Sequence, residues 1–543
     1  MRANKLPVLL LAAMLCLSLL LFHPWTSAQA AAFTVNDAGD ATDAAPGNGV
    51  CATAGAVCTL RAALVEANAL AGTDAIAFSG GITTINIATE LTISASVTIS
   101  GAGVTVDNTG TGRVIRITTG AVVIDGMQIT GGATSNGGGI YITGASSSLT
   151  LQGGAVVSGN DATNYGSGIY AGTNAQVTIT GAGTAVTGNL GASRGAGVYA
   201  SGGADLFLQN GAAIRDHTGA TTSGSGVYLT GSGTTLTVDN TVISGNTGAT
   251  NGGGVYATSS AALTLQNGAT VSGNDASSYG SGILAGTNAQ VTITGAGTAV
   301  AGNLGATSGA GIYASGGADV FLQNGAAIRD HTGATTSGSG VYLTGSGTTL
   351  TVDNAVISGN TGATNGGGVY ATSSAALTLQ NGAVVTQNGA SSRGGGVYLT
   401  GSASQLNVSG ARITYNTAGG NGDAVFQANG TTTMTNACIA CNGDSAIDRS
   451  GGTSPMGLGG NWWGSAWGPY YATSTEGLQC SAGDSLNSAR PLTVYGISVT
   501  TPAATCDSTP PVGNWLTAAT AGCTGAEIAA PSGMGHGRTC FPP

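Results

Sequence analysis

The sequence contains two copies of the tripeptide Arg-Asp-His, which are its clearest candidates for acid–base catalysis. Arg215-Asp216-His217 recurs as Arg329-Asp330-His331, and an imidazole beside a carboxylate is a common general acid–base pair. Each histidine, however, stands three residues after an isoleucine, a position that asparagine holds elsewhere in the chain. We therefore interpret both histidines as substituted positions of a structural column and predict no catalytic residue here.

The other acids and histidines do not form a second cluster in the sequence. Asp205, Asp239, Asp319 and Asp353 fall in separate repeats, and no lysine follows residue 30. A polysaccharide lyase or glycoside hydrolase needs clustered acids with a basic residue near the scissile bond. The run Gly535–Arg538 mimics part of a hydrolase motif, but it lies in a Cys-rich tail, and we interpret it as chance.

Cys438-Ile439-Ala440-Cys441 has the spacing of a redox or zinc pair. No second ligand pair accompanies it, so we favour a structural disulfide or buried thiols and predict no metal site. The glycine run Gly252–Gly254 has no P-loop lysine after it. We therefore assign it to a turn and predict no cofactor.

The best binding candidate is a recurring tyrosine. The pattern Gly-x-Gly-Val/Ile-Tyr returns every 28 or 29 residues. Its tyrosines are Tyr141, Tyr170, Tyr199, Tyr228, Tyr256, Tyr313, Tyr342, Tyr370 and Tyr398, with Leu284 and Phe426 at two equivalent positions. Stacked at one-turn spacing, they would form an aromatic strip that either packs on sugar rings or only stabilises the sheet.

The elements that position this strip are short strands. A fixed period of this length indicates a solenoid, and each repeat has three alternating segments bounded by turn residues, such as 227–229, 236–238 and 242–243. The repeats show no helical spacing of apolar residues, and the 96 glycines of the chain disfavour helices. We therefore predict an all-β protein, a parallel β-helix with Val227, Leu229, Leu236, Val238 and Ile243 in the bore and with Tyr228 and Thr237 outside.

A column of asparagines marks one corner of each turn. Its members are Asn160, Asn189, Asn246, Asn274, Asn303, Asn360, Asn388, Asn416 and Asn442. Asparagine tolerates left-handed backbone and bonds to nearby main chain, so stacked asparagines can seal a corner. With two weaker upstream turns, at Leu91–Asn108 and Val114–Gly132, we expect about 13 turns and a rod of roughly 60 Å.

The repeats also show a duplication. Residues 149–262 and 263–376 match at a shift of 114 positions with eleven differences. A solenoid tolerates such growth because each repeat packs only on its neighbours. Because a site inside this block would now exist twice, the duplication argues for selection of length.

The flanks indicate export. Arg2 and Lys5 precede an apolar run from Leu6 to Phe22, and Ala28-Gln29-Ala30 is a small-residue cleavage signal, the pattern of a secretory signal peptide; the alternative is an uncleaved anchor helix. Its removal leaves eight cysteines outside the duplicated block, which suits disulfides, with Cys51–Cys58 as the natural local pair. We divide the chain into a signal peptide (1–30), an N-terminal cap with a helix (31–85), the β-helix (86–470) and a Cys-rich C-terminal tail (471–543).

The charge and hydropathy of the chain limit the classes of partner that it can be expected to bind. After residue 30 the chain holds eleven arginines and 23 acids, so a nucleic-acid partner is not expected. No second apolar run has membrane-spanning length, and no integral membrane segment is expected after signal removal. With 7% charged residues, the outer surface must be built from hydroxyl, amide and tyrosine side chains, which contact water and sugars well.

Both open ends of a solenoid need covers. The segment 58–68 is the one clear helix, and Leu60, Ala63, Leu64, Ala67 and Leu70 lie on one face of it. We expect this helix to cover the first turn, with Gly72 ending it. At the other end, Trp462, Trp463 and Trp467 stand where the repeats stop, and we interpret them as a plug over the last turn.

These end segments resemble known families. Cys58-Thr59-Leu60-Arg61, followed by Ala67-Asn68, resembles the Cys-Ser-Leu-Arg-Glu-Ala N-terminal domain of exported bacterial β-helix proteins, although Thr59 and Ala62 depart from it. The Asn-Trp-Trp-Gly ending is similar to the last turn of right-handed parallel β-helix proteins. The turns resemble repeats of chlamydial polymorphic outer membrane proteins, with Ile or Val in place of Phe. The resemblance implies a right-handed β-helix and an exported, surface-associated protein, but no reaction.

We therefore expect a non-enzymatic secreted or cell-surface rod that serves structure or adhesion. Its expected partner is extracellular polysaccharide or a neighbouring cell surface. The alternative is a polysaccharide lyase or glycoside hydrolase acting on an extracellular polymer, which the regular turns disfavour because catalytic β-helices usually carry long irregular loops around a cleft.

Overall fold

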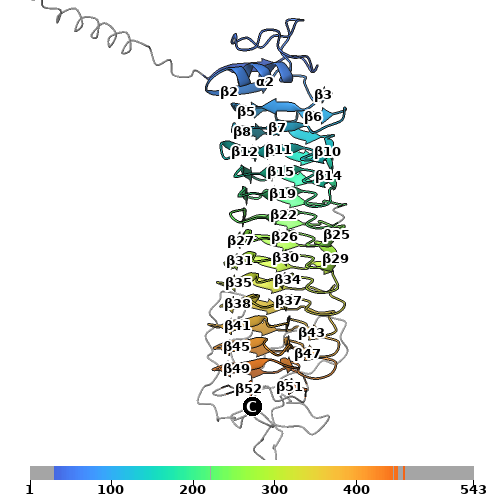
Figure 1. Ribbon diagram of the computed structural model, residues 1–543, viewed down its shortest axis with the longest axis vertical. Helices are drawn as coiled ribbons and strands as arrows, with labels where there is room; N and C mark the ends of the chain where they lie inside the picture. The colour runs from blue at the N-terminus through green and yellow to red at the C-terminus, as the bar shows by residue number, and fades with distance from the viewer. Residues whose placement is uncertain (1–29, 220–221, 444–445, 451–455, 459–460, 462–543) are drawn as a thin grey trace, which may run out of the picture.

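The described part of the protein is a rod of stacked β-strand turns with a helix at its N-terminal end (Figure 1). The computed structural model describes residues 30–219, 222–443, 446–450, 456–458 and 461. Three long sheets, which we call A, B and C, run the length of the rod, and every turn contributes one strand to each. The predicted parallel β-helix of about 13 turns is confirmed.

Among the described residues, sheet A contains sixteen strands. They are β1 (Ala32–Val35), β2 (Thr73–Phe78), β5 (Ser96–Ser100), β8 (Gly120–Asp125), β12 (Ser147–Gln152), β16 (Gln176–Thr180), β20 (Asp205–Gln209), β23 (Thr235–Asp239), β27 (Ala262–Gln266), β31 (Gln290–Thr294), β35 (Asp319–Gln323), β38 (Thr349–Asp353), β41 (Ala376–Gln380), β45 (Gln405–Ser409), β49 (Thr431–Thr435) and β52 (Met456–Gly457).

Sheets B and C contain fourteen strands each in the part of the chain that the structure describes. Those of sheet B are β3 (Thr84–Ile87), β6 (Thr105–Asn108), β9 (Gln128–Thr130), β13 (Val156–Ser158), β17 (Ala185–Thr187), β21 (Ala213–Arg215), β24 (Val242–Ser244), β28 (Thr270–Ser272), β32 (Ala299–Ala301), β36 (Ala327–Arg329), β39 (Val356–Ser358), β42 (Val384–Thr386), β46 (Arg412–Thr414) and β50 (Cys438–Ala440). Those of sheet C are β4 (Leu91–Ile93), β7 (Ile115–Ile117), β11 (Ile140–Thr143), β15 (Ile169–Gly172), β19 (Val198–Ser201), β22 (Val227–Thr230), β26 (Val255–Thr258), β30 (Ile283–Ala285), β34 (Ile312–Ser315), β37 (Val341–Thr344), β40 (Val369–Thr372), β44 (Val397–Leu399), β48 (Val425–Gln427) and β51 (Ile447–Arg449).

Short strands also form in the connection that leads from sheet B to sheet C. They are β10 (Ala133–Asn136), β14 (Asp161–Tyr165), β18 (Leu190–Gly191), β25 (Ala249–Asn251), β29 (Asp275–Tyr279), β33 (Leu304–Gly305), β43 (Gly389–Ala390) and β47 (Thr417–Ala418). This connection forms a side lobe along the rod, at the right of Figure 1. These strands have no counterpart among the three segments expected for each repeat.

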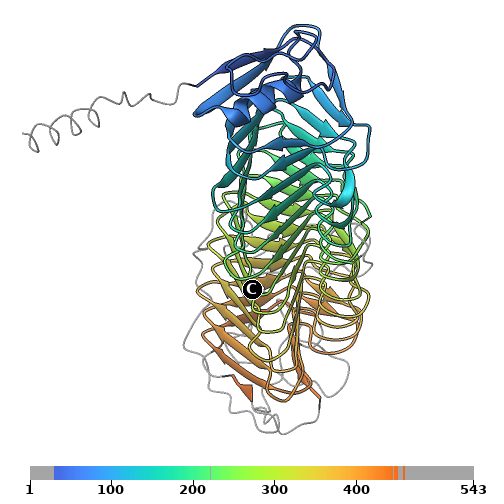
Figure 2. The same cartoon turned by 45° about the horizontal axis from the view of Figure 1, so that its top comes forward.

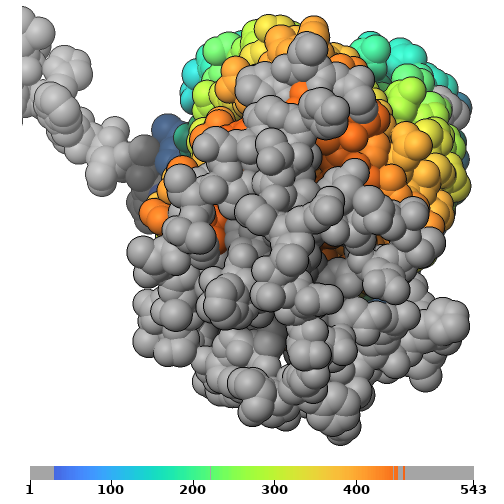
Figure 3. Space-filling model, turned by 90° about the horizontal axis from the view of Figure 1, so that it is seen from below, coloured from blue at the N-terminus to red at the C-terminus, as the bar shows by residue number. Residues whose placement is uncertain are grey.

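Strand alternation places the core where it was predicted. Val227, Leu229, Leu236, Val238 and Ile243 are each at most 1% exposed, and Thr237 lies outside the bore. The strands of each turn pair in parallel with the next turn, so identical positions stack: Val227 pairs with Val255 and Leu236 with Leu263. Figure 2 shows the strands of each sheet following one another in ranks along the rod. Seen from the C-terminal end, successive turns lie behind one another (Figure 3).

The N-terminal cap has the predicted helix. Helix α2 (Leu60–Ala69) has Thr59 as its N-cap, whose hydroxyl accepts the backbone N–H of Ala62 at 3.1 Å. Leu70 caps its other end, so the helix stops before Gly72, the residue that the sequence suggested. Its buried residues pack against the first strands, so the helix covers the start of the bore.

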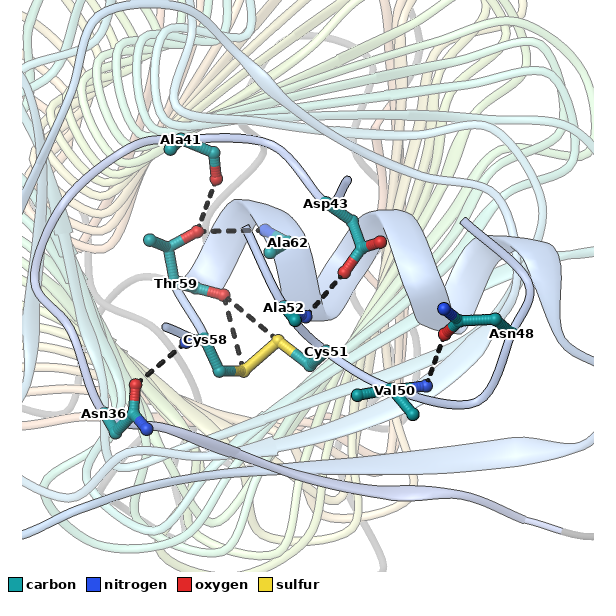
Figure 4. The surroundings of a disulfide bond; sticks show 10 residues. All are labelled: Asn36, Ala41, Asp43, Asn48, Val50, Cys51, Ala52, Cys58, Thr59 and Ala62. Atoms are coloured by element: carbon teal, nitrogen blue, oxygen red, sulfur yellow. Dashed lines mark hydrogen bonds between the residues drawn. A yellow bond between two sulfur atoms is a disulfide. The ribbon is translucent and has the colours of Figure 1, made fainter. Parts of the chain in front are cut away.

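A disulfide between Cys51 and Cys58 closes the loop before α2, as predicted. Figure 4 shows how the loop is held: the Asn36 side chain accepts the backbone N–H of Cys58 at 2.8 Å, and the Thr59 hydroxyl donates to the Ala41 carbonyl at 2.6 Å. The cap is thus tied to the strand that precedes it.

Near the C-terminal end, Asn461 is fully buried. Its side chain accepts the backbone N–H of Ala437 at 2.9 Å and donates to the Met434 carbonyl at 3.1 Å. The three tryptophans predicted to plug the last turn, the signal peptide up to residue 29 and the Cys-rich tail lie outside the described residues.

Candidate binding faces and the buried ladder

The tyrosine column lies outside the bore but is largely covered. Val227 and Leu229 point inward on either side of Tyr228, as the alternation predicts. Seven of the nine tyrosines are nevertheless only half-exposed, and Tyr199 and Tyr228 are 8% and 7% exposed. Tyr228 therefore lies outside the bore, as predicted. Its ring is nevertheless buried, because other groups pack against it.

The rings stack on one another. Neighbouring tyrosines have ring centroids 4.8 to 5.4 Å apart, and Tyr398 stacks on Phe426 at 5.2 Å. This spacing follows from the separation of adjacent strands, which is about 4.8 Å. Leu284 interrupts the stack between Tyr256 and Tyr313, so the column forms two ladders.

Residues of the side lobe cover these ladders. Tyr165 stacks on Tyr199 with centroids 4.7 Å apart, and Tyr279 packs on Tyr313 at 4.6 Å. The Arg194 guanidinium lies 5.5 Å from the centre of the Tyr228 ring, within the range of a cation–π contact.

Burial raises the pKa of Tyr228, Tyr313 and Tyr370 to about 12. Because both faces of each inner ring are occupied by neighbours, a sugar can reach these residues only at ring edges and hydroxyl groups.

The two Arg-Asp-His motifs do not form an acid–base site. His217 and His331 are fully buried, whereas Asp216 and Asp330 point to the surface and bond to the arginines before them, each at 2.6 Å. Burial lowers the pKa of both histidines to about 4, so they are neutral at pH 7. Both stand in the asparagine column, as predicted from sequence.

The asparagine column is a continuous buried ladder. The Asn246 backbone N–H and side-chain amide both donate to the Asn274 side-chain oxygen, at 3.1 and 2.8 Å, and Asn274 makes the same pair of bonds to Asn303. Most of these side chains also donate to a main-chain carbonyl of the preceding turn, as Asn274 does to the Ile243 carbonyl. The predicted role of these residues in sealing the corner is therefore confirmed.

The acids that could serve catalysis are spread over the rod and bonded across turns. Asp205 accepts the Thr235 hydroxyl at 2.6 Å, and Asp239 accepts the Gln266 and Asn267 amides. Within the described ranges, no group of three histidines, cysteines, aspartates or glutamates is placed to hold a metal ion. Cys438 and Cys441 are both in disulfide bonds, which agrees with a structural role.

A second face emerges on the outside of sheet A. Its central column, aligned by the strand register, is mostly threonine. The column runs Thr98, Val123, Thr150, Thr178, Phe207, Thr237, Thr264, Thr292, Phe321, Thr351, Thr378, Asn407 and Thr433. Gln, Asp, Thr and Ser side chains dominate the parallel columns on both sides.

Two phenyl rings interrupt this polar face. Phe207 and Phe321 are each 37% exposed, and each takes the place of a threonine between threonines of the adjacent turns. They lie four turns apart, about 19 Å along the rod. The alternation in the sequence predicts that Thr237 lies outside and does not by itself indicate a binding surface, although a Thr or Phe stands between each inward aliphatic pair.

Comparison of the chain with protein-family models, with curated proteins and with solved structures found no match. Within the described residues, no helix has the length and hydropathy that a membrane crossing requires.

Proposed function

We propose that the protein is an exported, non-enzymatic rod that serves structure or adhesion by holding extracellular polysaccharide along its outer surface. The observation that carries this proposal is the outer face of sheet A. There, hydroxyl and amide side chains repeat at about 4.8 Å along the sheet and surround two exposed phenyl rings.

This combination suits a sugar polymer. Aromatic rings take the apolar face of a sugar, and a few placed polar groups bond to its hydroxyls. A polymer lying parallel to the rod meets equivalent side chains at every turn, so many weak contacts act together. Asp205, Asp239, Asp319 and Asp353 lie in the flanking columns of this face, which favours a neutral polysaccharide over a polyuronate.

The tyrosine ladders are a second candidate surface for the same function. Seven of the nine side chains are half-buried rather than fully covered. Since their ring faces already pack on neighbouring rings, we assign them mainly to holding the rod together and place sheet A first as the contact surface.

A glycan array with the purified chain from residue 31 tests the function. We expect retention of neutral polysaccharides and no shortened or unsaturated products after long incubation. Steady turnover of any polymer would favour the lyase or hydrolase alternative, and failure to bind any extracellular polymer would remove the polysaccharide part of the proposal.

A further inference from the structure

Asp74 occupies an unusual place in sheet A. It lies on the inward side of β2, fully buried, in the strand register of an aliphatic column: Asp74 pairs with Val97, Val97 with Val122, and Leu149 follows. The first of these stacked positions thus holds a carboxylate where the next turns hold hydrocarbon.

Only half of this carboxylate is satisfied. One oxygen, Oδ1, accepts the backbone N–H of Ala31 at 2.7 Å, while Oδ2 is buried without a hydrogen-bond partner. In the part of the chain that the structure describes, Asp74 forms no ion pair with any arginine or histidine. A buried carboxylate with a single neutral donor is costly, because burial removes water and nothing compensates its charge.

The one donor it has comes from the residue that follows the cleavage signal. Ala28-Gln29-Ala30 places the scissile bond between Ala30 and Ala31, and Ala30 is exposed. The structure holds Ala31 firmly at this point: its carbonyl accepts the N–H of Ala75 at 2.8 Å, and β1 begins with the next residue.

We propose that signal-peptide cleavage between Ala30 and Ala31 creates an α-ammonium group that pairs with the buried Asp74 carboxylate, and that this partly buried ion pair locks the N-terminal edge of sheet A. The step is a hydrolysis by a signal peptidase. Water breaks the Ala30–Ala31 peptide bond, its oxygen remains on the new Ala30 carboxylate, and the Ala31 nitrogen gains protons. The nitrogen keeps its bond to Oδ1 and gains further donors for Oδ2.

Removal of the signal peptide therefore also stabilises the N-terminal edge of sheet A. In the uncleaved chain the same nitrogen is a neutral amide with one proton, which leaves Oδ2 unpaired. The charge that compensates Asp74 exists only after cleavage, so the edge strand β1 and the cap behind it reach full stability only in the processed protein.

The test compares two N-termini in otherwise full-length chains. One chain begins at Ala31 with a free amine, released from a fusion by a protease that leaves no extra residue, and the other keeps a Gly-Ser-Ala extension before Ala31. Each is made with Asp74 and as Asp74→Asn, and hydrogen exchange of the β1 and β2 amides is measured. We expect at least tenfold greater protection with the free amine in the Asp74 chains, and little difference in the Asp74→Asn chains.

A third variant, Asp74→Val, restores the aliphatic column and should return the extended chain to the protection of the free one. Equal protection of the two Asp74 chains, or a difference that persists in Asp74→Asn, would overturn the proposal. So would mass spectrometry of the exported protein that finds an N-terminus other than Ala31. These outcomes concern processing alone and leave the polysaccharide proposal to its own test.

Discussion

The imidazole of His217 replaces a carboxamide in the buried ladder, with its Nδ1 atom accepting the backbone N–H of Asn189 at 3.1 Å. The other ring nitrogen lies 3.1 Å from the Val186 carbonyl and, in this neutral tautomer, donates to it. Asn189 itself donates to the Val157 carbonyl one turn earlier, and the histidine reproduces this carbonyl contact and the contact with the preceding backbone N–H. A ladder asparagine such as Asn274 also accepts the side-chain amide of the preceding member, a bond that the histidine does not reproduce. His331 repeats the arrangement against Asn303 and Val300.

The first prediction is a loss of stability in mild acid. Burial lowers the pKa of His217 and His331 from 6.5 to about 4. Between these values the unfolded chain binds protons that the folded chain does not, so stability is full above pH 6.5 and falls as the pH drops toward 4. The loss is about 3 kcal/mol for each histidine, measurable as the denaturation midpoint against pH.

The matched control is the double variant His217→Asn/His331→Asn. Asparagine is the normal residue of the ladder, so the fold and its stability at pH 7.5 should hold. The acid-dependent loss between pH 6.5 and 4 should shrink to what the carboxylates alone produce. An unchanged pH profile would show that the histidines do not titrate as argued.

Much of this fold can be predicted because a solenoid repeats its local rules. The alternation around Val227 and Leu236 fixes the bore, the spacing from Ile243 to Asn246 fixes the corner, and the same reasoning identifies His217 as a ladder residue. Each of these inferences needs only residues within one turn, and the repeats then confirm one another.

The covering of the tyrosines could not be predicted in the same way. Tyr165 and Arg194 reach the ladder from the side lobe, and they pack on Tyr199 and Tyr228 of later turns. The alternation of residues in a strand predicts on which side of the sheet a tyrosine ring lies. It does not predict which residues of a neighbouring connection pack on that ring. For the same reason the outer face of sheet A could not be predicted from one turn alone. It is defined by the strand register, which places Phe207 beside threonines of the adjacent turns.

The second prediction joins the two tyrosine ladders. In Leu284→Tyr, the new ring fills the gap between Tyr256 and Tyr313 at the stacking distance of the column. Gly286 corresponds to Gly172, where an added Cβ would lie 2.9 Å from the Tyr170 ring, so the room a tyrosine needs is present. We expect a gain of about 0.5–1.5 kcal/mol, seen as a higher denaturation midpoint. Leu284→Ala should lower it, and a destabilised Leu284→Tyr would refute the stacking argument.

The third prediction concerns the duplicated block. Deleting residues 263–376 joins Ala262 to Leu377, which recreates the strand sequence shared by β27 and β41 and sets Tyr256 beside Tyr398. Because each turn packs only on its neighbours, the shortened rod should unfold cooperatively, with a smaller m value for its smaller buried surface. Deleting 263–362 instead joins a strand to a side-lobe connection and should abolish cooperative unfolding.

The fourth prediction concerns the cap. Replacing both Cys51 and Cys58 by serine opens a loop with a sequence separation of 7 residues and should cost about 2–3 kcal/mol of cap stability. Reduction of the wild-type protein should have the same effect on hydrogen exchange in α2. Amides of the central strand β31 should be unaffected, because they lie many turns away.

The last prediction tests the sheet A face. Phe207→Thr/Phe321→Thr gives two positions the residue that their column already holds above and below them, so the fold should survive. If the phenyl rings pack on sugars, each contributes about 1 kcal/mol, and their removal should weaken binding roughly fivefold per ring. Val242→Thr is the matched control, since Val242 is an equally exposed apolar residue on sheet B.

Alanine at Tyr199, Tyr228 and Tyr256 should instead lower stability, because those rings pack on one another. If the tyrosine variant loses polysaccharide binding while still folded, and the phenylalanine variant keeps it, the contact surface is the tyrosine column rather than sheet A.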